Sequence, residues 1–161
     1  MRRWIIAATA LIVLAVANVD VYRKEQLLAT GGTVLLELAP IDPRSLLQGD
    51  YMALRFRALD DAFGAGAGEL PADGRLVLGV DTDSVGTFRR FDDGTPLEAG
   101  EVLMRYRVRG GTPKLSTDAF FFQEGHAEYY APARYGEFRV AADGEALLVA
   151  LRGPDREVLG E

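Results

Sequence analysis

The chain has 161 residues and a formal net charge of −6, with no cysteine and a single histidine, His126. This length fits one domain of about 100–150 residues plus an appendage. Hydrophobic residues make up 48% and charged residues 26%, a balance typical of a globular protein rather than a disordered or polytopic one. The acidic balance argues against nucleic acid as a partner and against a broad affinity for anionic lipid surfaces. The missing cysteines exclude disulfides and thiolate chemistry, and one histidine cannot build a multi-histidine metal site.

The N-terminal segment has the pattern of a signal anchor. Arg2 and Arg3 precede an uncharged stretch over residues 4–19. As a helix, this stretch spans roughly 24 Å, slightly less than the roughly 30 Å hydrocarbon core of a bilayer. The small-x-small sequence at residues 15–17 leaves a cleaved signal peptide open, but the apolar run continues past it. The leading arginines favour a cytoplasmic N-terminus, which the basic residues 23–24 partly oppose.

We expect residues 1–28 to form a transmembrane helix with its juxtamembrane segment, and residues 29–161 to form a strand-rich extracytoplasmic domain. After the Gly31-Gly32 break, short β-forming segments alternate with clusters of Gly, Pro and Asp. The clearest alternation gives Met52, Leu54 and Phe56 a common face. The predicted strands cover residues 33–39, 51–59, 76–80, 84–91, 102–109, 115–123, 138–141 and 146–151.

This pattern predicts a mainly β fold, a small barrel or sandwich-like antiparallel domain preceded by one N-terminal transmembrane helix. Asp143-Gly144 is a preferred pair for a tight hairpin turn, in which both central residues can need positive φ. The Gly- and Ala-rich residues 60–74 are expected to form a surface loop or a short helix.

Residues 40–51 predict a corner between two strands. Asp42 is suited to cap a helical turn, and Pro43 to occupy its first position. Gly49 can adopt the positive φ that redirects the chain, and Asp50 can hydrogen-bond the local backbone.

Residues 49–56, with the sequence GDYMALRF, resemble the defining motif of the GDYxxLxY family, a family of uncharacterised bacterial membrane-anchored proteins. Phe56 replaces the final tyrosine, so the ring is kept and the hydroxyl is lost. Residues 42–46, 123–125 and 133–137 also resemble this family. The resemblance implies an envelope protein that works beside polytopic membrane proteins, and it brings no catalytic residues. The motif and structural residues are Asp42, Pro43, Arg44, Gly49, Asp50, Tyr51, Leu54 and Phe56.

A second likeness concerns signal peptidases, which place Ser-x-x-Pro shortly before a Gly-Asp pair that opens a strand. The nucleophile position falls near Ile41, which has no hydroxyl. A Ser–Lys dyad would therefore have to use Ser45 with Lys114. This hydrolase, or one using a carboxylate pair such as Asp42 and Asp50, stays open as an alternative on a shared β scaffold.

Arginines offer a candidate anion-binding surface. Three share one face of the strand predicted over residues 102–109, and two share one face of the strand over residues 51–59. If these strands pair, a basic stripe results that could bind an anionic headgroup, a glycan or an acidic partner. The favoured interpretation is that the arginines are solvated and pair with acidic residues across strands. The candidate binding residues are Arg55, Arg57, Arg105, Arg107 and Tyr135, with Arg109 on the same face as the last two arginines.

Glu124, His126 and Glu128 would share a face on an extended strand and could then hold a metal ion. Because Gly125 favours a turn, an exposed polar face is the preferred interpretation. Asp81 and Asp83 likewise predict a turn rather than a catalytic carboxylate pair.

Phe120, Phe121 and Phe122 place aromatic rings on both faces of one predicted strand. The favoured interpretation has one face in the core and the other covered by residues 129–135. The alternative is an exposed aromatic ridge that binds a partner protein.

These patterns together predict a non-enzymatic, membrane-anchored envelope protein without cofactor or metal, its domain on the periplasmic side of the bacterial cytoplasmic membrane. It would be a binding or accessory subunit of a polytopic membrane protein. The alternatives are the Ser45/Lys114 hydrolase and a binder of a small anionic ligand on an arginine-lined face.

Overall fold

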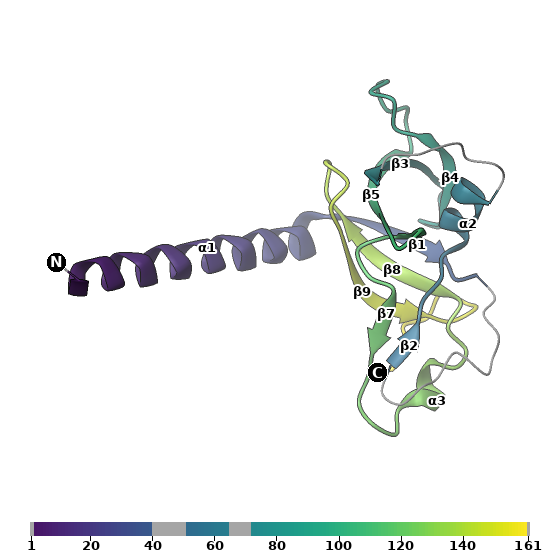
Figure 1. Ribbon diagram of the computed structural model, residues 1–161. Helices are drawn as coiled ribbons and strands as arrows, with labels where there is room; N and C mark the ends of the chain where they lie inside the picture. Colours follow the sequence, from purple (N-terminus) through teal and green to yellow (C-terminus); the bar gives the residue numbers. More distant parts are fainter. Residues whose placement is uncertain (1, 40–50, 65–71, 161) are drawn as a thin grey trace.

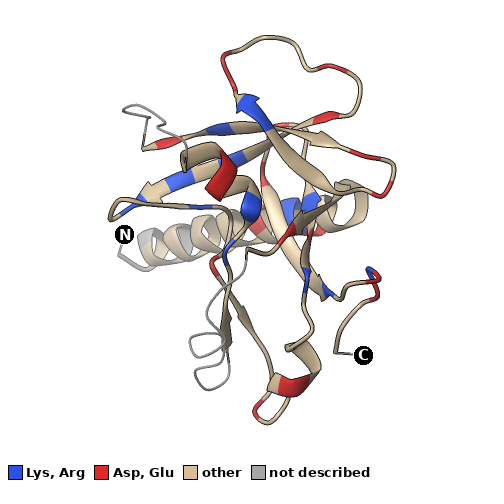
Figure 2. Ribbon diagram, turned by 90° about the vertical axis from the view of Figure 1, so that its right-hand side faces the viewer, with Lys and Arg blue, Asp and Glu red and all other residues tan. Residues whose placement is uncertain are grey.

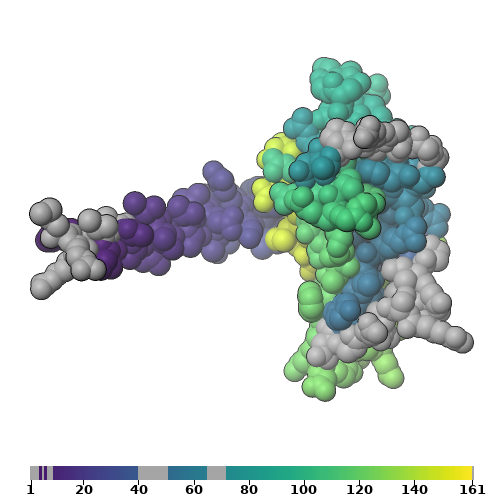
Figure 3. All heavy atoms as spheres, in the orientation of Figure 1, coloured from purple at the N-terminus to yellow at the C-terminus, as the bar shows by residue number. Residues whose placement is uncertain are grey.

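A computed structural model describes residues 2–39, 51–64 and 72–160. A 29-residue helix projects from a β domain, as the ribbon and the space-filling view both show (Figures 1 and 3). The elements are α1 (Arg2–Thr30), β1 (Gly32–Glu37), β2 (Tyr51–Ala53), α2 (Arg57–Phe63), β3 (Asp73–Val80), β4 (Gly86–Phe91), β5 (Glu101–Arg109), β6 (Thr112–Lys114), β7 (Ala119–Phe121), α3 (Ala127–Tyr130), β8 (Tyr135–Val140) and β9 (Ala146–Arg152).

The described strands form three antiparallel sheets, in the orders β1-β8-β9, β2-β7 and β4-β3-β5-β6. The four-stranded sheet curves like a half-barrel (Figure 1). The backbone N–H of Leu35 donates to the carbonyl of Ser84 at 2.8 Å, which joins the two larger sheets. The prediction of a mainly β antiparallel domain is confirmed, while the described strands form three sheets rather than one closed barrel.

The turn between β8 and β9 confirms the hairpin predicted at Asp143-Gly144. Gly144 has φ +88°, and its N–H donates to the Ala141 carbonyl at 3.0 Å. The Asp143 carboxylate accepts a hydrogen bond from the Glu145 N–H at 3.0 Å. The bond from Gly144 to Ala141 makes Ala142 and Asp143 the central residues of the turn, and Gly144 follows them with positive φ. The prediction that Asp143 and Gly144 are the central pair is therefore wrong, although the hairpin lies where it was predicted.

The strand predicted over residues 51–59 ends at Ala53, and the chain enters α2 at Arg57. The predicted common face of Met52, Leu54 and Phe56 is nevertheless confirmed, because all three side chains are buried. Beyond Phe56 the apolar spacing becomes helical, and α2 buries Ala58, Leu59 and Ala62 on one face. The predicted loop or helix at residues 60–74 is thus partly helix α2, and residues 65–71 lie outside the described residues.

The strand predicted over residues 115–123 is also shorter than expected. β6 ends at Lys114, and β7 includes only Ala119–Phe121. Between them the Thr117 hydroxyl donates to the Ala119 carbonyl at 2.8 Å. This local side-chain hydrogen bond takes the place of a backbone bond to a neighbouring strand. The chain between Lys114 and Ala119 is therefore not part of a strand.

The turn predicted at Asp81 and Asp83 is confirmed. The Asp81 carboxylate accepts hydrogen bonds from the N–H groups of Asp83 and Val85 at 2.9 and 2.8 Å. Ser84 takes the positive φ of this turn, at +64°.

The core lies where the sheets and α2 face each other. α2 packs on β4 and β1, and Phe63 contacts Phe91 and Tyr106 edge to face. The largest fully buried side chains are Phe56, Phe138, Leu36, Leu76, Leu78, Met104, Leu151, Val34 and Val77.

Helix α1 continues through the juxtamembrane segment and ends at Thr30, directly before the Gly31-Gly32 break. It contacts β8 and β9, and Leu27 is buried there. Toward the N-terminus its large apolar side chains are exposed, from Trp4 at 80% to Tyr22 at 61%. In the part of the chain that the structure describes, no helix is both long and apolar enough to cross a membrane.

Candidate functional site

The described part of the motif divides between surface and core. Tyr51 is 36% exposed, whereas Leu54 and Phe56 are buried. Phe56 packs edge to face on Phe138 with ring centroids 5.3 Å apart. A Cβ on Gly136 would lie 2.9 Å from the Phe56 ring, so this glycine makes room for it. The aromatic ring at the last motif position therefore fills the core.

Tyr51 and Phe121 form an exposed aromatic pair. They are register partners on β2 and β7, and their ring centroids lie 5.8 Å apart. Phe121 is 74% exposed, whereas Phe120 and Phe122 pack against Tyr130 at 5.0 and 5.3 Å. One face of the aromatic run is thus covered by the 129–135 segment, as predicted. The other face, however, points to solvent instead of into the core.

A hollow of about 510 Å³, here called the motif hollow, lies beside the buried motif residues. Two ion pairs flank it, Arg55–Asp60 at 2.8 Å and Lys114–Asp118. The Leu54 N–H donates to the Asp118 carbonyl at 2.8 Å, which holds the motif against the loop after β6. The lining residues are Ala53, Leu54, Arg55, Phe56, Leu59, Asp60, Thr112, Pro113, Lys114, Leu115, Thr117 and Asp118.

The hydrolase alternative depends on residues that the structure does not describe, because Asp42, Ser45 and Asp50 lie outside the described residues. Pro43, Arg44 and Gly49 lie outside them as well. Lys114 is described, and its ammonium group is paired with Asp118. An ammonium group held by a carboxylate is a poor general base for a Ser–Lys dyad.

The same ion pair predicts a pH dependence. The hydrogen bond from Lys114 lowers the pKa of the Asp118 carboxyl below its usual value of 3.8. The stabilising contribution of the ion pair is therefore present above the unfolded-state pKa of Asp118. It is lost as the pH falls through the lower folded-state pKa of this carboxyl. We expect Asp118→Asn to lower the free energy of unfolding by about 0.2–1 kcal/mol near neutral pH, and the loss to shrink in strong acid as the carboxyl becomes protonated.

Urea unfolding at neutral pH and in strong acid measures this difference. Asp155→Asn is the control, because Asp155 is exposed and has no ion pair among those of the described residues. A loss for Asp118→Asn that stays constant down to acid pH contradicts the prediction.

The arginines do not form a single stripe, because the strand pairing on which the stripe depends is absent. β2 pairs with β7, whereas β5 pairs with β3 and β6. Arg55 follows the end of β2, and Arg57 begins α2, which makes the prediction of a shared strand face wrong. Arg57 instead pairs with Glu37 at 3.2 Å, and Arg134 pairs with the same carboxylate at 2.7 Å.

The arginines of β5 do share one exposed face. Arg105 pairs with Asp143 at 2.6 Å, and Arg107 and Arg109 approach Asp73 at 3.7 and 4.0 Å. Basic and acidic residues lie among one another in the middle of the β domain (Figure 2). The predicted pairing with acidic residues is therefore confirmed, although Arg105 and Arg107 also line a hollow together with Lys24.

The remaining candidates lie apart from these features. Tyr135 is half-buried in β8, opposite Glu37. Glu124 is in a turn with Gly125 at φ +82°, and His126 precedes α3, so the spacing-two residues are not on an extended strand. Among the described residues, no group of three or more His, Asp or Glu side chains could hold a metal ion.

The fold and the motif define a class of protein, a small antiparallel β domain on a long N-terminal helix. The chain matches the family described as GDYXXLXY protein over residues 13–151 and belongs to this family. No curated protein and no solved structure matches the chain.

Proposed function

We propose that this protein is a non-enzymatic binding subunit that α1 attaches to a membrane and that contacts a polytopic membrane protein through the aromatic pair. The observation that carries this proposal is the distribution of apolar side chains around α1.

Apolar side chains surround α1 on every side. Leu11, Ile12, Val13 and Leu14 are consecutive and each is 61–70% exposed. Since consecutive helical residues differ by about 100° in direction, these four point around the whole helix. A partner helix would cover one stripe of such a surface, whereas lipid covers all of it.

The polar features of α1 support the same arrangement. The Asn18 side chain donates to the Leu14 carbonyl at 2.8 Å, so its amide has a partner inside the helix. Charged residues begin at Asp20, which pairs with Lys24 at 3.1 Å. The uncharged residues 4–19 are shorter than the roughly 20 that usually cross a bilayer, and we propose that the residues beside them complete the crossing within the headgroup layer.

The charge pattern favours one orientation. Arg2 and Arg3 lie directly before the apolar stretch, and basic residues there are retained on the cytoplasmic side. We propose that the β domain lies on the periplasmic face of the bacterial cytoplasmic membrane.

The aromatic pair is the proposed contact surface. Exposed aromatic rings are common anchors of protein interfaces because they bury a large area with few rotatable bonds. A tether confines the domain to one membrane and raises its effective concentration toward partners in that membrane. A membrane protein is therefore the expected partner class.

A photocrosslinking amino acid placed at Phe121 in the full-length protein tests this proposal. The matched control carries the same amino acid at Leu97, an exposed apolar residue in the loop between β4 and β5. We expect Phe121 to crosslink to one membrane protein and Leu97 not to do so. Adding Tyr51→Ala should reduce the Phe121 crosslink at least about tenfold. Equal products from both positions would contradict the proposal.

A further inference from the structure

We infer that a hollow between α1, β5 and β9 binds the phosphate group of an anionic phospholipid. The hollow has a volume of about 460 Å³ and is called the basic hollow here. The inference rests on the proposed membrane attachment of α1. The lining residues that carry it are Lys24, Leu27, Arg105, Arg107, Leu115 and Glu145.

The basic hollow combines charges from two elements that are far apart in sequence. Lys24 comes from α1, and Arg105 and Arg107 come from one face of β5. Glu145 is the one carboxylate among the lining residues. Each cation also has a carboxylate nearby, since Lys24 pairs with Asp20 and Arg105 with Asp143. The case for phosphate therefore rests on the guanidinium donors that remain free, because guanidinium groups bind phosphate oxygens in pairs.

The two guanidinium groups keep donors for a ligand. Arg107 approaches Asp73 at 3.7 Å, which is longer than a hydrogen bond. Arg105 donates from Nε to the Asp143 carbonyl at 3.3 Å and from Nη2 to the Asp143 carboxylate at 2.6 Å. The Nη1 group of Arg105 has no partner among these bonds and remains for a phosphate oxygen.

The position of the basic hollow along α1 suits a lipid headgroup. Lys24 lies four residues beyond Asp20, the first charged residue after the apolar stretch. This places Lys24 about 6 Å further along the helix axis. The polar layer on each side of the hydrocarbon core is roughly 5–8 Å thick. A phosphate in that layer is therefore at the height of the basic hollow.

Apolar side chains complete the lipid-like character of the basic hollow. Leu27 and Leu115 line it and are each only 7% exposed. They offer contacts to the glycerol and first acyl carbons, which a free phosphate ion does not possess. A phospholipid therefore uses more of the basic hollow than an isolated anion does.

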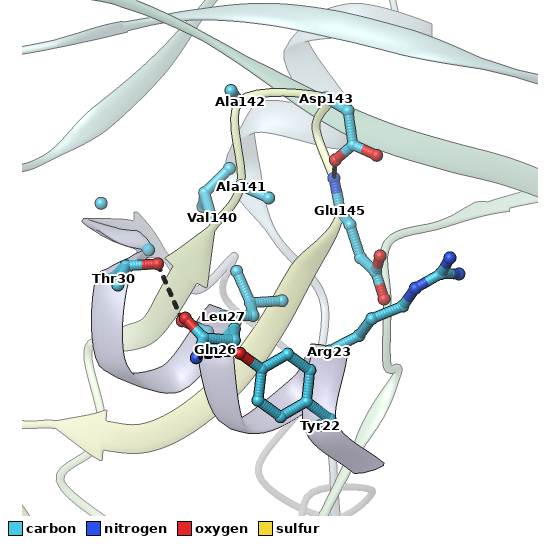
Figure 4. Close-up of a pocket in the computed structure, with 12 residues that line it drawn as sticks. Tyr22, Arg23, Gln26, Leu27, Thr30, Val140, Ala141, Ala142, Asp143 and Glu145 are labelled. Carbon is cyan, nitrogen blue, oxygen red and sulfur yellow. Dashed lines mark hydrogen bonds between the residues drawn. The ribbon is translucent and has the colours of Figure 1, made fainter. Parts of the chain in front are cut away.

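A second hollow, which Leu27 also lines, is less suited to an anionic ligand. It is lined by α1 and the β8–β9 turn, and Figure 4 shows Arg23 extending toward Glu145. Asp143 also lines it, and Arg23 is the one cation among its lining residues, so it lacks the two neighbouring guanidinium groups of the basic hollow. Anion binding is consequently assigned to the basic hollow alone.

Native mass spectrometry of the full-length protein in detergent tests the inference. The probes are phosphatidylglycerol, which is anionic, and phosphatidylcholine, which is zwitterionic. We expect the protein to retain phosphatidylglycerol in preference. The double variant R105Q/R107Q should weaken this retention at least about tenfold, because two charge-assisted contacts are lost.

The matched control is R89Q/R109Q, which removes the same charge. Arg109 is on the same face of β5, and Arg89 is exposed on β4, yet neither lines the basic hollow. Ser116→Glu is a second variant, since Ser116 is exposed and lines the basic hollow. It places a carboxylate there without removing an arginine, and it should also abolish the preference.

Three outcomes would overturn the inference. These are equal retention of the two lipids, equal losses in R105Q/R107Q and R89Q/R109Q, and displacement of phosphatidylglycerol by millimolar inorganic phosphate. The last would assign the basic hollow to free phosphate. Extraction from phosphatidylcholine vesicles with alkaline carbonate tests the membrane attachment separately. If the protein resists extraction but does not prefer phosphatidylglycerol, the inference about the basic hollow is wrong and the proposed membrane attachment is still supported.

Discussion

Replacing Phe56 with alanine is expected to lower the free energy of unfolding by about 3–5 kcal/mol. Phe56 is 1% exposed and belongs to the main core cluster. The substitution removes a ring that packs on Phe138 and leaves a cavity beside Gly136. Because β2 and α2 flank Phe56 directly, their attachment to the rest of the domain should weaken together.

Denaturant unfolding followed by far-ultraviolet circular dichroism measures this effect. Phe121→Ala is the control, because it removes the same ring from an exposed position of β7. It should change the free energy of unfolding by no more than about 0.5 kcal/mol. Similar losses for the two variants would show that the motif phenylalanine has no special part in the core.

The proposed membrane attachment predicts that two arginines in the middle of the apolar stretch detach the protein from the membrane. Leu11→Arg and Ile12→Arg each cost about 2.5–3.5 kcal/mol at the centre of a membrane helix. The double variant should therefore move from the carbonate-resistant membrane fraction to the soluble fraction. The β domain should remain folded, because neither side chain contacts its core cluster.

The control for this variant places the same charges outside the apolar stretch. Val21 and Leu28 are exposed apolar residues of α1 that lie beyond the first charged residue. The variant V21R/L28R should stay in the membrane fraction. If L11R/I12R also stays there, lipid does not surround that part of α1.

Features set by neighbouring residues were predictable from the sequence. The end of α1 at the two glycines, the hairpin at Asp143-Gly144 and the burial of alternate residues from Met52 to Phe56 each depend on local conformational preference. The exposure of Phe121 was predicted only as the alternative for the three phenylalanines, and its pairing with Tyr51 was not predicted. This exposure depends on which face of β7 meets the core, and the run places rings on both faces.

Features set by distant residues were not predictable in the same way. The pairing of β1 with β8 joins segments about a hundred residues apart, and no local signal specifies it. The buried Glu137 was missed because a register shift after it places Gly136, Glu137 and Phe138 all inside, which breaks the alternation. Its partner is Arg152, at 2.6 Å on the neighbouring strand.

The basic hollow was also not predictable from the sequence, because it is formed by residues that are far apart in the chain. The sequence singled out Arg105 and Arg107 but grouped them with Arg55, which lines the motif hollow instead. Lys24 was assigned to the flank of the anchor and not to a site. Its proximity to β5 arises from the packing of Leu27 against the β domain, which a single-sequence pattern does not encode.

The central claim is that α1 is embedded in a membrane with the β domain outside it, and labelling of single cysteines tests this most directly. The chain has no cysteine, so each introduced thiol reports alone. A membrane-impermeant maleimide is added to intact spheroplasts producing the full-length protein. We predict that cysteines at Gln26 and Phe121 are labelled and that cysteines at Leu11 and Leu14 are protected until detergent is added. Labelling at Leu11 and Leu14 without detergent would contradict the claim.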